Sequence, residues 1–139
     1  MKPSTREWVA KAEEDCLAAL DLARRRKRPL WSGVYFHAQQ CAEKYLKARM
    51  EEAGLPLQRT HDLDELLNHA LPVEPLWSAF RPALQTLTDY AVDFRYPGHT
   101  ANKSHARRAL TDCKAIRREV RTSPGLAGLS PGQRHEMHP

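Results

Sequence analysis

Residues 34–48 read VYFHAQQCAEKYLKA, and this stretch decides the fold. Plotted on a helix, one side is apolar and carries Val34, Ala38, Cys41, Ala42, Tyr45 and Ala48. The opposite side is polar and carries Gln40, Glu43, Lys44 and Lys47. No Gly or Pro interrupts the stretch. The pattern predicts a long amphipathic helix from about Trp31 to Ala53, stopped by Gly54.

Two features of the polar side go beyond what a core helix needs. Phe36 and Met50 fall there, where a monomer would expose them. Gln40, Lys44 and Lys47 form one row of amide and ammonium groups at helical spacing. Exposed large apolar side chains are typical of contact surfaces, so the pattern predicts a homodimer.

The segment from Phe36 to Ala48 closely resembles the central helix of HEPN domains, small helical proteins often paired with minimal nucleotidyltransferases in prokaryotes. Thr60-His61-Asp62-Leu63 and Arg95-Tyr96-Pro97 resemble the family's two later landmarks, in the right order. The resemblance covers about residues 1–122. It implies an all-α, up-and-down bundle of four main helices plus one short helix.

Composition sets wide bounds on function. A chain of 139 residues has room for one domain with a real core. The net charge of +5 and the pI near 9.3 suit nucleic acid, nucleotide phosphates or an acidic partner, and select none of them. No apolar run approaches the ~18 residues of a membrane span, and no signal peptide is recognised. We expect a cytoplasmic protein.

The three cysteines are expected to be reduced thiols in the core. Cys16, Cys41 and Cys113 each lie on an apolar helical stripe. Their number is odd and no CxxC spacing occurs, which favours neither a disulfide framework nor a structural metal site.

The first helix is expected to begin at Ser4, because Ser4-Thr5-Arg6-Glu7 has the capping-box pattern. It is expected to end in the cationic run Arg24-Arg25-Arg26-Lys27-Arg28, before Pro29. Cations at a helix C-terminus interact favourably with its dipole. The run is therefore either a solvated helix end or a phosphate-binding patch.

A loop is expected before a short helix at about residues 62–70. Thr60 or Asp62 is expected to cap that helix. His61 is expected to pin the loop to the helix over 31–53 by a hydrogen bond, and a catalytic role would need a partner that the sequence does not place. Further on, Pro82 is expected at the first turn of a new helix that follows a short helical piece.

The last helix is expected from about Thr100 to Arg121. Beside its apolar stripe lies a basic strip, made of Arg107, Lys114, Arg117, Arg118 and Arg121. Such a strip is either solvated or follows a phosphate backbone. Residues 123–139 are rich in Pro and Gly and are expected to form a disordered tail. His135 and His138 in that tail make too weak a pair to hold a metal, and no metal or cofactor is expected.

The sequence holds no P-loop, GxGxxG or HExxH motif. Many HEPN relatives are metal-independent ribonucleases with an Arg, four to six residues and a His, repeated across a dimer. In such a site the His moves a proton and the Arg stabilises charge on phosphate. Here only three residues, including Pro97-Gly98, separate Arg95 from His99, and nine separate Arg95 from His105. Neither spacing matches, so the chain's status as an enzyme stays open.

The Arg-Tyr-Pro form resembles a branch of the family associated with nucleotide binding or with a nucleotidyltransferase partner. The resemblance implies that Arg95 grips a phosphate and that Tyr96 stacks on a base. The predicted phosphate-binding set also includes Gln40, Lys44, Lys47, Arg107 and Lys114. The alternative for Arg95 is a structural ion pair with Asp62 or Glu43, and the alternative for Tyr96 is a ring packed over a turn.

Three functional hypotheses follow. The first is a nucleotide- or nucleic-acid-binding HEPN protein that serves as the substrate-binding or toxin-like partner of a minimal nucleotidyltransferase. The second is a ribonuclease toxin that uses Arg95 and His99. The third is a helical interaction module without a ligand.

Overall fold

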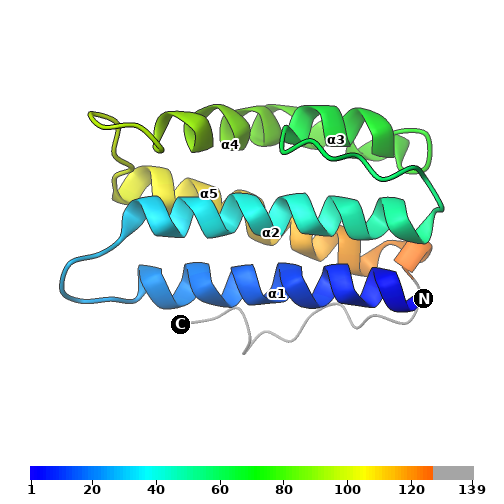
Figure 1. The fold of residues 1–139 in the computed structure, drawn as a ribbon, viewed down its shortest axis with the longest axis horizontal. Helices are drawn as coiled ribbons and strands as arrows, with labels where there is room; N and C mark the ends of the chain where they lie inside the picture. Colours follow the sequence, from blue (N-terminus) through cyan, green and yellow to red (C-terminus); the bar gives the residue numbers. More distant parts are fainter. Residues whose placement is uncertain (127–139) are drawn as a thin grey trace.

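The computed structural model describes residues 1–126, and within them it contains helices and no strand (Figure 1). The α-helices are α1 (Pro3–Ala23), α2 (Trp31–Glu52), α3 (Leu63–Ala70), α4 (Arg81–Asp93) and α5 (Lys103–Thr122). Two 3-10 turns accompany them, η1 (Pro75–Phe80) and η2 (Pro124–Leu126). The predicted all-α bundle of four main helices and one short helix, α3, is confirmed.

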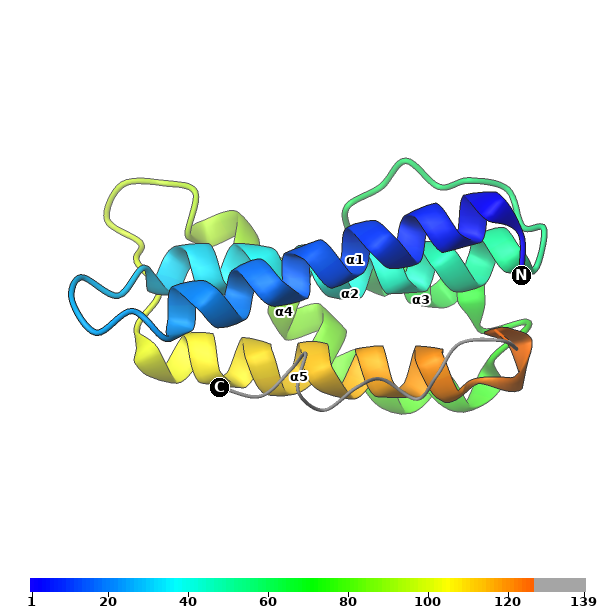
Figure 2. The ribbon, with the colours of Figure 1, turned by 90° about the horizontal axis from the view of Figure 1, so that it is seen from below.

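The central element of the bundle is α2. It lies between α1 on one side and the layer of α3 and α4 on the other (Figure 1), and α5 runs along a further side (Figure 2). Its predicted apolar stripe is buried throughout: Val34, Ala38, Cys41, Ala42, Tyr45 and Ala48. Periodic burial of this kind is the main source of helix stability in a bundle.

The polar side of α2 is less exposed than the sequence pattern predicted. Phe36 is exposed over 45% of its surface, as expected, but Met50 is only 3% exposed, so its predicted exposure was wrong. After α2 the chain folds back, and the Leu55 amide donates to the Met50 carbonyl at 3.0 Å. Leu55 also packs against the core beside Met50. A central helix is covered on more sides than an amphipathic pattern suggests.

The predicted capping box at Ser4 was also wrong. Helix α1 begins at Pro3, whose missing amide hydrogen costs nothing in the first turn. Ser4 already lies inside the helix, and its hydroxyl donates to Glu51 Oε1 at 2.8 Å. The helix ends at Ala23, so the run Arg24–Arg28 lies in the loop to α2 and not in the last helical turn.

Other boundary predictions are confirmed. Asp62 caps α3, with its Oδ1 accepting from the Asp64 amide at 2.9 Å. Pro82 lies in the first turn of α4, directly after η1. Asn102 caps α5 a few residues later than Thr100, the expected start.

The described chain stays ordered beyond the expected end of the domain. Ser123 Oγ donates to Glu74 Oε2 at 2.6 Å, and Leu126 is 1% exposed in the core. The predicted disorder was therefore wrong for residues 123–126. The rest of the predicted tail, with His135 and His138, lies outside the described residues. Within the described part of the chain, no helix is long and apolar enough to cross a membrane.

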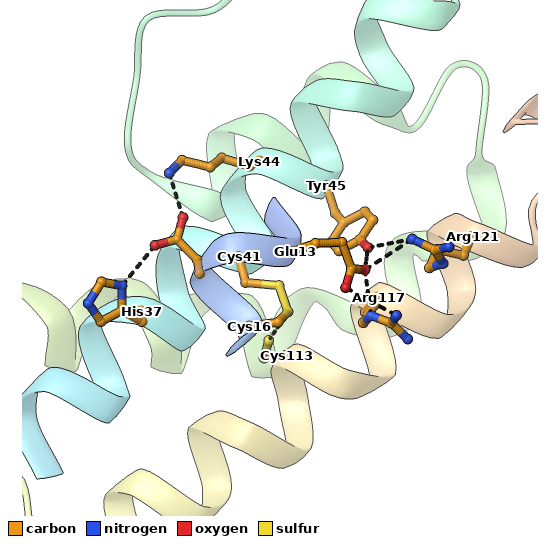
Figure 3. Close-up of a disulfide and its surroundings, with 10 residues drawn as sticks. Glu13, Cys16, His37, Cys41, Lys44, Tyr45, Cys113, Arg117 and Arg121 are labelled. Carbon is orange, nitrogen blue, oxygen red and sulfur yellow. Dashed lines mark hydrogen bonds and ion pairs between the residues drawn. A yellow bond between two sulfur atoms is a disulfide. The ribbon is translucent and has the colours of Figure 1, made fainter. Parts of the chain in front are cut away.

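The cysteine prediction was right about burial and wrong about oxidation state. Cys16 on α1 and Cys41 on α2 form a disulfide with a Cα–Cα distance of 5.7 Å (Figure 3). Cys113 on α5 keeps a free thiol, 3.6 Å from the Cys16 sulfur. The apolar stripes of α1, α2 and α5 meet where these three cysteines lie. Sequence spacing alone could not reveal this contact.

Candidate functional site

The loop between α1 and α2 and the loop between α4 and α5 lie at the same end of the bundle (Figures 1 and 2). They are joined by a hydrogen bond from the Ala101 amide to the Ser32 hydroxyl, at 3.2 Å. The first loop carries the exposed cationic run Arg24–Arg28, and the second carries Arg95. The fold therefore gathers cations from distant parts of the sequence at one end.

A cavity of about 440 Å³ lies between the α1–α2 loop and the first turns of α5. Four of its lining residues are cationic: Arg25, Arg26, Lys103 and Arg107. The other five are apolar: Ala23, Pro29, Trp31, Ala106 and Leu110. We call this the basic cavity. Its volume lies in the range of small-molecule sites, and its wall combines positive charge with one large aromatic ring.

The capping of α5 positions one wall of the basic cavity. Asn102 Oδ1 accepts from the His105 amide at 2.9 Å, and His105 Nδ1 accepts from the Asn102 amide at 3.1 Å. This reciprocal bond holds the imidazole in the tautomer protonated at Nε2. The His105 ring also packs against Tyr90 and Phe94, with centroids 5.1 and 5.2 Å away. His105 thus orders the turn that carries Lys103.

Arg95 and Tyr96 lie in the turn that follows α4. The His99 amide donates to the Tyr96 carbonyl at 3.2 Å, and Gly98 takes the left-handed φ of 87° that this tight turn requires. Tyr96 is 63% exposed, so its ring is not packed over the turn. Within residues 1–126, the side chains of Arg95 and His99 form no hydrogen bond or ion pair with each other or with another residue.

The proposed ion-pair partners of Arg95 are engaged elsewhere. Glu43 Oε1 lies 3.1 Å from His61 Nδ1, which confirms the predicted bond between the loop and α2. Glu43 also accepts from Lys47 Nζ at 3.2 Å, and Asp62 caps α3. The structural ion pair predicted as the alternative for Arg95 is therefore absent from residues 1–126, and its guanidinium faces solvent.

The predicted polar row of α2 does not reach the basic cavity. Lys44 pairs with Asp15, which also bonds His37 (Figure 3). Lys47 is 7% exposed and lies over the Trp8 ring, while Gln40 donates to the Gln39 side chain. At about 1.5 Å per residue, Lys44 lies roughly 20 Å along the helix from Trp31. The side chains of Lys44, Lys47 and Gln40 therefore contact residues of α1 or of α2 itself.

The predicted basic strip of α5 divides into two parts. Arg117 Nε donates to Glu13 Oε1 at 2.7 Å, and Arg121 Nη1 donates to the same oxygen at 3.0 Å (Figure 3). The Tyr45 hydroxyl donates to it as well. Burial, and then the Glu13 charge, raise the pKa of Tyr45 above its ordinary value. Arg107, at the other end of the helix, lines the basic cavity, and Lys114 lies half-exposed between the two parts.

Sequence reasoning identified some of the cavity residues and missed others. It named the run Arg24–Arg28 and Arg107, but not Lys103 or Trp31. The spacing of Lys103 and Arg107, one helical turn apart at the start of α5, was an available signal. That Trp31 faces these cations follows only from the packing of α2 and α5.

Comparison with protein families identifies the fold. The HEPN domain family model matches residues 5–123, which is well over half of the chain. The comparison with curated proteins and the comparison with solved structures each find no match. The matched region contains the predicted landmark segments and every α-helix of the described bundle, apart from the first two residues of α1. The chain therefore belongs to the HEPN domain family.

Proposed function

We propose that this HEPN protein binds a nucleotide or a nucleic acid through phosphate groups held in the basic cavity. The observation that carries the proposal is the meeting of four cations around one cavity of about 440 Å³. HEPN domains are known for nucleic-acid and ribonuclease-related roles, and a phosphate ligand agrees with them.

The charge of the cavity wall supports an anionic ligand. Arg25, Arg26 and Arg107 repel one another across the cavity, and a bound phosphate removes that repulsion. Guanidinium groups bind phosphate oxygens through paired hydrogen bonds. The N-terminal end of α5, where the helix dipole is positive, adds positive potential on the same side.

The aromatic groups of this end support binding of a base next to the phosphate. Trp31 forms part of the cavity wall, and Tyr96 presents an exposed ring in the neighbouring loop. Stacking of bases on aromatic rings contributes about 1–3 kcal/mol per base in single-strand binders. In this proposal Arg95 holds a further phosphate outside the cavity.

Two assembly features belong to the proposal and rest on the family resemblance. The first is a homodimer, supported by the exposed Phe36. The second is a partnership with a minimal nucleotidyltransferase, whose nucleotide or nucleic-acid substrate the basic cavity would bind.

A metal-independent ribonuclease is the second candidate function. One observation favours it: Arg95 and His99 lie in the same turn, and both side chains are exposed. The His could transfer a proton from the 2′-hydroxyl while the Arg stabilises the phosphate. This candidate predicts RNA cleavage, whereas the leading proposal predicts binding without cleavage.

A mixed-sequence RNA incubated with the protein in EDTA separates these candidates. We expect intact RNA and binding that weakens with salt for the wild type, and weaker binding for Arg107→Ala. Cleavage by the wild type that is lost in His99→Ala would replace the leading proposal with the ribonuclease. Absence of binding to both the RNA and a nucleoside triphosphate would leave the third hypothesis, an interaction module without a ligand.

A further inference from the structure

Three sulfur atoms converge in the core, away from the lining of the basic cavity. Cys16 on α1, Cys41 on α2 and Cys113 on α5 place their Sγ atoms within 4.8 Å of one another (Figure 3). All three residues have 0% exposure. Each comes from a different helix, so one atom bound to all three would join α1, α2 and α5.

In the oxidised protein two of these sulfurs are joined, because Cys16 and Cys41 form the disulfide. A phosphine reductant opens it: one phosphine and one water give the phosphine oxide and two thiols. The disulfide is reduced by two electrons and the phosphorus is oxidised by two. The reduced protein then holds three thiols around one point.

We propose that the reduced protein binds trivalent arsenic, supplied as arsenous acid, through Cys16, Cys41 and Cys113. Three thiols react with one As(OH)₃ to give As(SR)₃ and three waters. Three As–O bonds break and three As–S bonds form, each thiol proton leaves with a hydroxyl group as water, and arsenic stays in the +3 state. The product carries no net charge.

The As(SR)₃ complex carries no net charge, and this favours trivalent arsenic over other thiophilic ions at the buried site. All three sulfur atoms belong to fully buried residues on three helices, so the site disfavours an uncompensated charge. The charges around it have both signs: Arg117 and Lys114 oppose Glu13 and Asp15. Arg117 is already paired with Glu13, and Lys44 with Asp15. The neutral As(SR)₃ complex needs no counter-charge, whereas an anionic complex would need one inside this core.

Other thiophilic ions fit the site less well. Three thiolates around Zn²⁺ carry one negative charge, and zinc almost always takes a fourth ligand. Three thiolates around Cu⁺ carry two negative charges, although copper accepts soft sulfur ligands readily. Burying either charge without a partner is costly. Trivalent arsenic needs neither a fourth ligand nor a counter-charge.

Access to the buried site requires local opening of the helices. Arsenous acid is uncharged at neutral pH, so it enters without the cost of desolvating an ion. The bound atom would then hold three helices together, and by linkage it stabilises the folded state.

Native mass spectrometry of the phosphine-reduced protein tests the proposal. With arsenite, we expect one adduct of arsenic minus three protons, and no adduct on the oxidised protein. Cys113→Ser retains two thiols, so its adduct should keep one hydroxyl on arsenic, and its affinity should be at least tenfold lower. If that variant does not fold, the proton count of the wild-type adduct decides the question alone.

Three outcomes would overturn the proposal. The first is a wild-type adduct that retains a hydroxyl. The second is equal affinity in the wild type and Cys113→Ser. The third is displacement of arsenic by equimolar Zn²⁺ or Cu⁺, which would assign the site to a charged ion instead.

Discussion

Glu13 on α1 accepts from Arg117 on α5 at 2.7 Å, and this pair links the C-terminal half of the basic strip to α1. Arg121 and the Tyr45 hydroxyl bond the same carboxylate. Arg107, on the same helix, lines the basic cavity instead. One basic strip in the sequence thus divides into a part that stabilises the fold and a part that faces a cavity.

Glu13→Gln should destabilise the fold, because it removes the carboxylate charge that the largely buried Arg117 and Arg121 share. We expect the free energy of unfolding to fall by about 2 kcal/mol in urea titrations. The matched control is Glu14→Gln, since Glu14 is exposed on the same helix. Equal effects of the two substitutions would show that the Glu13 cluster contributes nothing specific.

Arg95→Ala should leave stability unchanged within about 0.5 kcal/mol, because its guanidinium has no partner in residues 1–126. The same substitution should weaken RNA binding, because Arg95 then no longer contributes a phosphate contact. Thermal unfolding and fluorescence anisotropy measure the two effects separately. A large fall in melting temperature with unchanged binding would assign Arg95 a structural role.

His61→Ala should cost about 1 kcal/mol of stability through loss of the bond to Glu43, and it should not change RNA affinity. The control is His69→Ala, since His69 is exposed near the end of α3. Loss of RNA binding in folded His61→Ala would place His61 in the binding site and contradict its structural role.

Asp112→Asn should stabilise the protein at pH 7 and have no effect at about pH 3. Burial raises the pKa of Asp112 above its ordinary value, and this outweighs the opposing effect of Arg108. A carboxyl with a raised folded-state pKa contributes its full stability below the unfolded-state pKa and loses it as pH rises through the folded-state pKa. Asn stays uncharged throughout, so the melting temperatures of the two proteins should diverge with rising pH.

Asp21→Asn provides the control for this pH dependence, because Asp21 is exposed on α1. Its melting temperature should follow the wild type at both pH values. Destabilisation by Asp112→Asn at pH 7 would mean that the pair with Arg108 outweighs burial.

Phe36→Glu should dissociate the proposed homodimer, because it places a charge on the exposed apolar position of α2. Leu17→Glu on α1 is matched in exposure, at 45% for both residues, and should leave the dimer intact. Size-exclusion chromatography with light scattering measures the mass. A wild-type mass of only 15.9 kDa at micromolar concentration would refute the dimer.

The sequence allowed the helices to be predicted because burial follows local periodicity. The apolar stripe of α2 and the break before Pro82 depend on neighbouring residues alone. Met50 was misassigned because a loop outside the helix covers it. The Cys16–Cys41 disulfide was missed because it depends on how far α1 and α2 are shifted along each other, and local sequence does not show that shift.

The candidate site was less predictable than the fold. The run Arg24–Arg28 and Arg107 were recognisable as cationic segments, but their meeting around Trp31 depends on the packing of α5 against α2. Lys44 and Lys47 were assigned to phosphate binding from charge alone. The structure pairs Lys44 with Asp15 on α1, a contact that a helical pattern does not encode. It pairs Lys47 with Glu43 one turn earlier on α2, and that spacing was visible in the sequence.

The most direct test of phosphate binding in the basic cavity compares Arg107→Glu with Arg118→Glu. Both substitutions reverse one charge on α5, but only Arg107 lines the cavity, while Arg118 is exposed outside it. Fluorescence anisotropy with a labelled mixed-sequence RNA gives the affinity at low and high salt. We predict a loss of about tenfold or more for Arg107→Glu and less than about threefold for Arg118→Glu at low salt. Equal losses in the two variants would contradict the account, because they would show that net charge, and not the cavity, binds the ligand.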